Sequence, residues 1–170
     1  MTDDRTPILV GVGQLTQRDD GLEQALEPVA MMAVAARTAA DDAGAGAGLL
    51  AALDHVAVVN VLCFPYGNAP RLLAERVGAH PAREISTTIG GNTPQSLLNH
   101  LCDEIASGRR ELALLVGGEA FATMRALGKA GLTSRWTPPR DTNAPRWGDL
   151  RDGMSPLETQ HGAREAYVTY

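Results

Sequence analysis

The sequence predicts an α/β fold in which helices cover a mainly parallel sheet. Three observations lead to this prediction. Short apolar runs rich in β-branched residues recur along the 170-residue chain, stretches with apolar residues at helical spacing separate them, and glycine or proline stands near most junctions. Strands that alternate with helices in this order lie parallel in one sheet. A chain of this length is expected to form one core-bearing domain.

The first predicted strand and helix occupy the amino-terminal quarter. Residues 8–12 form a continuous apolar run ended by Gly13, as in a strand that is buried on both faces. The polar residues 14–21 should form a loop. Residues 27–43 have helical spacing and many alanines, which predicts a helix packed closely on its neighbour. The glycine-rich residues 44–48 predict a flexible connector.

The second β-α unit follows the same pattern. Residues 54–62 are mostly apolar and predict a buried strand. Residues 63–70 contain proline, glycine and asparagine, so they predict a loop. Residues 71–77 predict a short helix closed by Gly78.

The central unit combines a strand, a glycine turn and a helix. Residues 84–89 are rich in β-branched residues and stop at Gly90 and Gly91. Thr93 is the expected N-cap of the helix, and Pro94 suits its first turn because no N–H is needed there. Apolar residues then recur at helical spacing up to a glycine stop.

Such a turn has a chemical consequence. Unpaired N–H groups and the positive end of the helix dipole point at one spot, which suits an anion or a developing oxyanion. The other interpretation is that Gly90 and Gly91 only let the helix pack tightly on its strand. The turn alone does not separate the two interpretations.

The last part of the chain changes in character. Residues 111–116 predict a strand, and residues 121–130 have a helical pattern. Residues 132–170 contain four prolines and little periodicity, which is typical of a functional loop or lid. We therefore expect an α/β core over residues 1–121 and a loop domain over residues 122–170.

Composition excludes several classes of partner. The hydrophobic share of 44% and the charged share of 21% are ordinary for a globular protein. A formal net charge of -5 gives no electrostatic footprint for nucleic acid, and no apolar run approaches the ~20 residues of a membrane span. The amino terminus is too polar for a signal peptide, and the two cysteines form no metal-type pair. A cytoplasmic location is the expectation.

Residues 105–108 (Ile-Ala-Ser-Gly) and 112–121 (Leu-Ala-Leu-Leu-Val-Gly-Gly-Glu-Ala-Phe) resemble a pattern of the thiolase superfamily: a helix end, a buried strand and a Gly-Gly-x-Glu-like turn. Residues 8–14 resemble the first strand of that fold. The resemblance implies the amino-terminal βαβαβαβ half of a thiolase-like fold, with part of the loop domain that lies over the acyl-CoA site. The Gly-His-Pro and Cys-x-Gly motifs of the second half do not occur. We therefore expect a fragment that continues beyond Tyr170, or a chain that pairs with a partner.

The resemblance also bears on the nucleophile. Counted back without a gap from residues 105–108, the nucleophilic cysteine of the family falls on Gly91, so this chain has no thiol there. The Gly-Gly-Asn-x-Pro-Gln turn is similar to that of thiolase-like proteins called acetyl-CoA acetyltransferases. This implies an acyl-CoA-binding protein of an acyltransferase family in lipid metabolism, without cysteine-based thiolase activity. The expected substrate-binding residues are Gly90, Gly91, Asn92 and Thr93, with Glu119 as an orienting group.

The sequence assigns no complete pair of nucleophile and base, which nucleophilic catalysis needs. Three side chains are candidates for catalysis: Cys63 at a strand end, Tyr66 in the following loop, and His161 in the loop domain. Cys102 lies inside a predicted helix and is expected to be a core residue. No zinc spacing, phosphate-loop lysine or dinucleotide fingerprint occurs, so we expect no metal and no covalently bound cofactor, with CoA or acyl-CoA as ligand.

Two other functions remain open at this point. Some thiolase relatives are lyases that cleave a carbon–carbon bond in an acyl-CoA together with a small OB-fold partner. A non-catalytic CoA-binding or assembly module is the other alternative. The predicted helix after Pro94 carries Gln95, Asn99, His100 and Asp103, which would need partners if buried. They are either solvated or paired across an interface, and we expect a homo-oligomer formed through this helix and the exposed face of the sheet.

Overall fold

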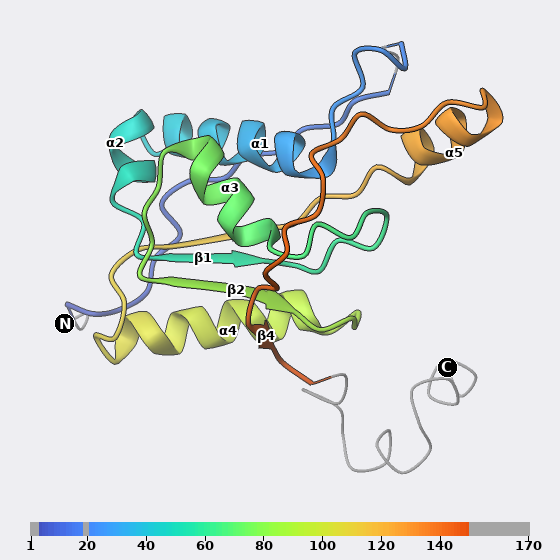
Figure 1. Ribbon diagram of the computed structural model, residues 1–170. Helices are drawn as coiled ribbons and strands as arrows, with labels where there is room; N and C mark the ends of the chain where they lie inside the picture. Colours follow the sequence, from blue (N-terminus) through green and yellow to red (C-terminus); the bar gives the residue numbers. More distant parts are fainter. Residues whose placement is uncertain (1–3, 19–20, 150–170) are drawn as a thin grey trace, which may run out of the picture.

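The computed structural model describes residues 4–18 and 21–149 and has three layers (Figure 1). The middle layer is a sheet whose strands are all parallel, in the order β3-β1-β2-β4. This confirms the predicted parallel α/β architecture. The strands are β1 (His55–Val58), β2 (Arg83–Thr87), β3 (Ala113–Val116) and β4 (Arg146–Trp147).

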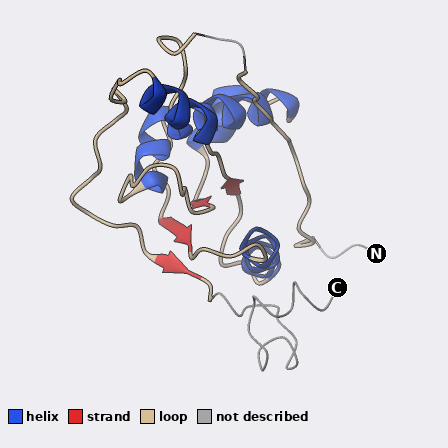
Figure 2. Cartoon of the chain, turned by 90° about the vertical axis from the view of Figure 1, so that its right-hand side faces the viewer, coloured by secondary structure: helices blue, strands red, loops and turns tan. Residues whose placement is uncertain are grey.

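Helices cover both faces of the sheet. Figure 2 shows α4 end-on, with the strands between it and most of the other helices. Contacts place α1, α2 and α3 together on one face, and α4 against β2 and β3 on the other. The helices are α1 (Pro28–Asp42), α2 (Gly46–Ala51), α3 (Ala69–Val77), α4 (Thr93–Ala106) and α5 (Phe121–Lys129).

The alternation of side chains along β1 divides the core into two clusters. Val56 and Val58 are fully buried against α1 and α3. Ala57 points the other way and packs with Ile85 and with Leu97 of α4. Successive side chains of a strand point to opposite faces of its sheet, so β1 supplies both cores.

The prediction of a strand over residues 8–12 is wrong, because this segment lies outside the sheet. β1 pairs directly with β3, for example Val56 with Leu114, which leaves no place between them. Ile8 is 75% exposed and Leu9 is 80% exposed. Apolar character indicated a buried strand, but it does not specify a pairing partner.

Residues 8–13 instead lie along α1. The amide of Val12 donates to Asp42 Oδ2 at 2.9 Å. A Cβ at Gly11 would collide with the carbonyl oxygen of Ala39, and one at Gly13 with the corresponding oxygen of Ala35. The two glycines therefore allow this backbone to approach the helix closely.

Helix boundaries follow the prediction with two corrections. Gly78 ends α3 with a φ of 73°, as its position predicted. Part of the predicted connector over residues 44–48 belongs to α2, because burial of Leu50 in the core stabilises this turn of helix. The N-cap of α4 is Asn92 and not Thr93. Thr93 is already helical, and its hydroxyl donates back to Gly90 O at 2.8 Å.

Residues 132–145 form no helix or strand, but they are fastened to the core. Residues 146–147 add β4 to the edge of the sheet beside β2. The amide of Arg140 donates to Tyr66 O at 2.9 Å, and that of Ala144 donates to Gly67 O at 3.2 Å. Both described tryptophans contact other rings: Trp136 packs edge-on against Phe64, and Trp147 stacks on His100.

Candidate functional site

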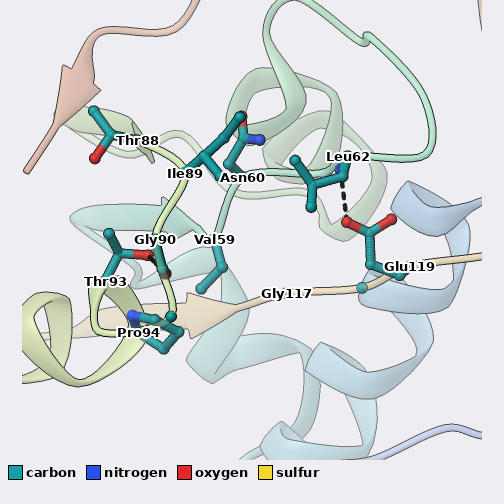
Figure 3. A pocket seen from close by; sticks show the side chains of 12 residues that line it. Val59, Asn60, Leu62, Thr88, Ile89, Gly90, Thr93, Pro94, Gly117 and Glu119 are labelled. Carbon is teal, nitrogen blue, oxygen red and sulfur yellow. Dashed lines mark hydrogen bonds between the residues drawn. The ribbon is translucent and has the colours of Figure 1, made fainter. Parts of the chain in front are cut away.

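A pocket of about 520 Å³ lies at the carboxyl ends of β1, β2 and β3 (Figure 3). In parallel sheets this edge is where ligands bind, because the loops that follow the strands converge there. Three short segments that directly follow the three strands form most of the wall. The lining residues are Val59, Asn60, Leu62, Thr88, Ile89, Gly90, Gly91, Thr93, Pro94, Gly117, Gly118 and Glu119.

The predicted glycine turn forms one side of this pocket. Gly90 and Gly91 connect β2 to α4, and Thr93 and Pro94 bring the first turn of that helix to the wall. Neither glycine has a positive φ, so a left-handed backbone is not what the turn requires. The amide and hydroxyl of Thr93 both donate to Gly90 O, which closes the turn. The positive end of the α4 dipole therefore lies at the pocket.

Glu119 connects two sides of the pocket. Its Oε1 accepts the N–H of Leu62 at 2.6 Å, and its Oε2 accepts the N–H of Cys63 at 3.0 Å. Figure 3 shows the first of these bonds crossing from the end of β3 to the loop that follows β1. The carboxylate thus orients a loop that lines the pocket.

Cys63 is placed poorly for nucleophilic chemistry. Burial raises the pKa of its thiol to about 11, and the neighbouring Glu119 carboxylate adds to this rise. The sulfur accepts the N–H of Ala120 at 3.3 Å. A thiol with such a pKa is protonated near neutral pH, and Cys63 is not among the lining residues.

Of the other two catalytic candidates, Tyr66 is described and is not among the residues that line the pocket. Tyr66 is 2% exposed, and its hydroxyl donates to Glu27 Oε2 at 3.0 Å. Burial and the charge of Glu27 raise the pKa of this phenol well above its usual range. His161 lies outside the described residues. Asn92 is the N-cap of α4 but is not among the residues that line the pocket.

Asn60 and Thr88 line the pocket, and the sequence analysis did not single them out. The backbone N–H of Asn60 donates to Thr87 Oγ1 at 2.9 Å. Arg146 donates to the side-chain oxygen of Asn60, Oδ1. A signal was present, since Asn60 interrupts the apolar run of residues 56–62. A polar residue at the end of a buried strand often faces a ligand site.

A second polar cluster lies at the opposite end of the sheet. Nδ1 of His55 is 3.0 Å from Glu104 Oε2, and both side chains are almost fully buried. Burial lowers the pKa of His55, as do the charges of Arg83 and Arg110, whereas Glu104 opposes the shift. His55 is the first residue of β1, while the pocket begins beyond the end of that strand, so this cluster is separate from the pocket.

The described residues show no sign of two other kinds of site. Within this part of the chain, no group of three or more His, Cys, Asp or Glu side chains is arranged to hold a metal ion. None of the described helices combines the length and apolar composition that crossing a bilayer requires.

Comparison with known proteins finds a related solved structure. The chain is similar to a monomeric SCP2-thiolase like protein type 1 from Mycobacterium smegmatis, with a TM-score of 0.60 and 36% sequence identity. The match covers 69% of this chain and 24% of that chain, so the present chain spans about a quarter of the length of that protein. No protein-family model matches, and no curated protein matches. The fold is thus thiolase-like, and the similarity supports a place in the thiolase-like superfamily.

Proposed function

We propose that this chain is an acyl-CoA-binding protein that holds the acyl thioester at the Gly90–Gly91 turn, without cysteine-based acyl transfer. The observation that supports the proposal most is the position of the pocket. It lies at the carboxyl ends of three parallel strands and against the first turn of α4. A carbonyl oxygen at this place meets the positive end of a helix of 14 residues.

The wall of the pocket suits an acyl group. Valine, leucine, isoleucine, proline and glycine make up most of the lining residues. Apolar walls with a few polar groups are typical of small-molecule sites, in which the polar groups fix the orientation of the ligand. Asn60, Thr88 and Glu119 are the polar groups available beside the turn, together with Thr93.

The residues that line the pocket favour ligand binding over catalysis. Among the described lining residues, Glu119 is the one ionisable side chain, and both of its oxygens already accept backbone N–H groups. By the sequence resemblance, the family position of the nucleophile falls on Gly91. This favours a non-catalytic CoA-binding module over a lyase that works with an OB-fold partner, because a lyase needs a general base within reach of its substrate.

Titration calorimetry of the 170-residue chain with acetyl-CoA and with free CoA tests the proposal. Ile89 lines the pocket and is 61% exposed, so an Ile89→Asp variant should fold normally. A carboxylate there would lose hydrating water when the apolar acyl group binds beside it. This should weaken acetyl-CoA binding at least tenfold, about 1.4 kcal/mol. Leu132→Asp is the matched control, since Leu132 is 55% exposed and does not line the pocket. Equal binding by the three proteins would contradict the proposal.

Intact-protein mass spectrometry checks the chemical part of the proposal. After incubation with acetyl-CoA, we expect no covalent acetyl-enzyme, because no activated thiol lies at the pocket. An added acetyl group removable by hydroxylamine would show that a nucleophile exists and would overturn this part.

A further inference from the structure

We propose that Asn60 is the hydrogen-bond donor that selects the ligand carbonyl, and that Arg146 holds its amide in the donating orientation. The inference rests on the proposed function, because it concerns the same pocket. It adds a recognition group and a positioning residue from the edge strand β4. In Figure 3, Asn60 lies between Ile89 and Leu62 among the residues around the pocket.

The backbone of Asn60 is fixed first. Its N–H donates to Thr87 Oγ1 at 2.9 Å, and Thr87 is fully buried at the end of β2. This bond joins the segment that follows β1 to the neighbouring strand, directly beyond the last residue pair of the two strands. The Cα of Asn60 is therefore held at the wall of the pocket.

The side chain of Asn60 is fixed by a second strand. Arg146 is the first residue of β4, and its Nη1 donates both to Asn60 Oδ1 and to Thr87 O, the latter at 2.8 Å. Arginine has only donors, so the amide atom facing it must be the oxygen. This contact decides between the two orientations of the amide, which differ by exchange of O and N.

The polarity of the pocket follows from this orientation. With Oδ1 occupied by Arg146, the group of Asn60 that remains available is Nδ2, which carries two N–H donors. No described protein group accepts a hydrogen bond from it. A ligand that offers an acceptor, such as a thioester carbonyl, gains a bond here, whereas a ligand that lacks one leaves the donor unpaired.

The test compares two ligands that differ in the carbonyl alone. Acetyl-CoA carries the thioester oxygen, and S-ethyl-CoA is the thioether that replaces C=O by CH₂. The wild-type chain should bind acetyl-CoA about tenfold more tightly, which is the effect of one well-placed hydrogen bond in a pocket. Asn60→Ala should remove this preference by weakening acetyl-CoA binding to the level of the thioether.

Two further variants test whether the orientation of the Asn60 side-chain amide matters for binding. Asn60→Asp keeps the shape and the pairing with Arg146 but presents an oxygen to the pocket, so acetyl-CoA should bind more weakly than to Asn60→Ala. Arg146→Ala leaves Asn60 in place but allows its side-chain amide to flip. The preference for acetyl-CoA over S-ethyl-CoA should therefore fall, while the affinity for S-ethyl-CoA stays the same. Asn99→Ala on the exposed face of α4 is the control with the same substitution elsewhere.

The outcomes separate this inference from the proposed function. If the wild type binds both ligands equally, or Asn60→Ala weakens both to the same extent, acyl-CoA binding stands and the role of Asn60 is overturned. If Arg146→Ala keeps the full preference, Arg146 is not a positioning residue. If neither ligand binds to the wild type, the proposed function fails and the inference fails with it. Thermal unfolding of each variant verifies that the fold is intact.

Discussion

Glu27 shows how a single buried side chain can hold distant parts of the chain together. Its carboxylate accepts hydrogen bonds from the amide of Thr137 at 2.9 Å, from the hydroxyl of Thr137 at 2.7 Å and from Tyr66, and it pairs with Arg76. Burial alone would raise the pKa of Glu27. The hydrogen bonds from Thr137 and Tyr66, with the charge of Arg76, outweigh burial and lower this pKa.

A lowered pKa in the folded state has a definite effect on stability. The ionised carboxylate stabilises the fold above its unfolded pKa of about 4.5, and this contribution is lost as the pH falls through the folded pKa. We expect Glu27→Gln to lower the free energy of unfolding by roughly 1–3 kcal/mol near neutral pH, because its NH₂ faces other donors. The deficit should shrink below about pH 4. Urea unfolding at a series of pH values measures both effects, with the exposed Glu23→Gln as control. A deficit independent of pH would contradict this assignment.

The role of Glu27 was not visible in the sequence, although its place at a helix start was. The segment of residues 27–43 predicted the helix correctly, and Glu27 is its N-cap. The main partner, Thr137, lies 110 positions away. No local pattern indicates which residue of an irregular loop will meet a given carboxylate, because such contacts depend on the tertiary fold.

At the level of elements, the sequence predicted helices better than strands. α4 was predicted nearly to its ends by Pro94 and the spacing of its apolar residues, which are local signals. The predicted strand over residues 54–62 ends at Val58, and two of the apolar residues beyond it, Val59 and Leu62, line the pocket. An apolar run in the sequence does not distinguish a paired strand from the wall of a pocket.

The position of the α4 amino terminus can be probed directly with a thiol. A Gly91→Cys variant places sulfur at the end of the helix dipole, where the thiolate is stabilised. We expect this thiol to react with iodoacetamide near neutral pH at least tenfold faster than Cys63, whose pKa is about 11. Peptide mass spectrometry over time gives the two rates in one sample. Equal rates would mean that the helix terminus does not act on this position.

Considered as a whole, the described part of the molecule exposes large apolar side chains at several places, and two of these places are residues 8–12 and α4. Residues 8–12 include Leu9, which is 80% exposed, and α4 exposes 40% of Leu98 on the side away from the sheet. The polar side chains of that helix face are partly satisfied within the chain, since Gln95 donates to Asn99 at 3.0 Å. Contiguous exposed apolar surface is typical of interaction sites.

We therefore expect the chain to self-associate, in contrast to the similar protein, which is described as monomeric and of which the match covers 24%. Sedimentation velocity over a range of concentrations measures the association. Leu98→Asp should weaken it about tenfold if α4 forms the interface, and Leu9→Asp should do so if residues 8–12 form it. A monomeric mass for the wild type at all concentrations would exclude this expectation.

The contact between Glu27 and Thr137 also has a consequence for synthesis of the protein. A nascent chain exposes residue 27 to the solvent long before residue 137 leaves the ribosome, so the carboxylate lacks the two hydrogen bonds from Thr137 during that interval. Contacts of such large sequence separation form late, because a long loop must close first. The contacts of Glu27 can therefore be completed only after translation has passed the loop, and chains that end before Thr137 would lack two of the hydrogen bonds to this carboxylate.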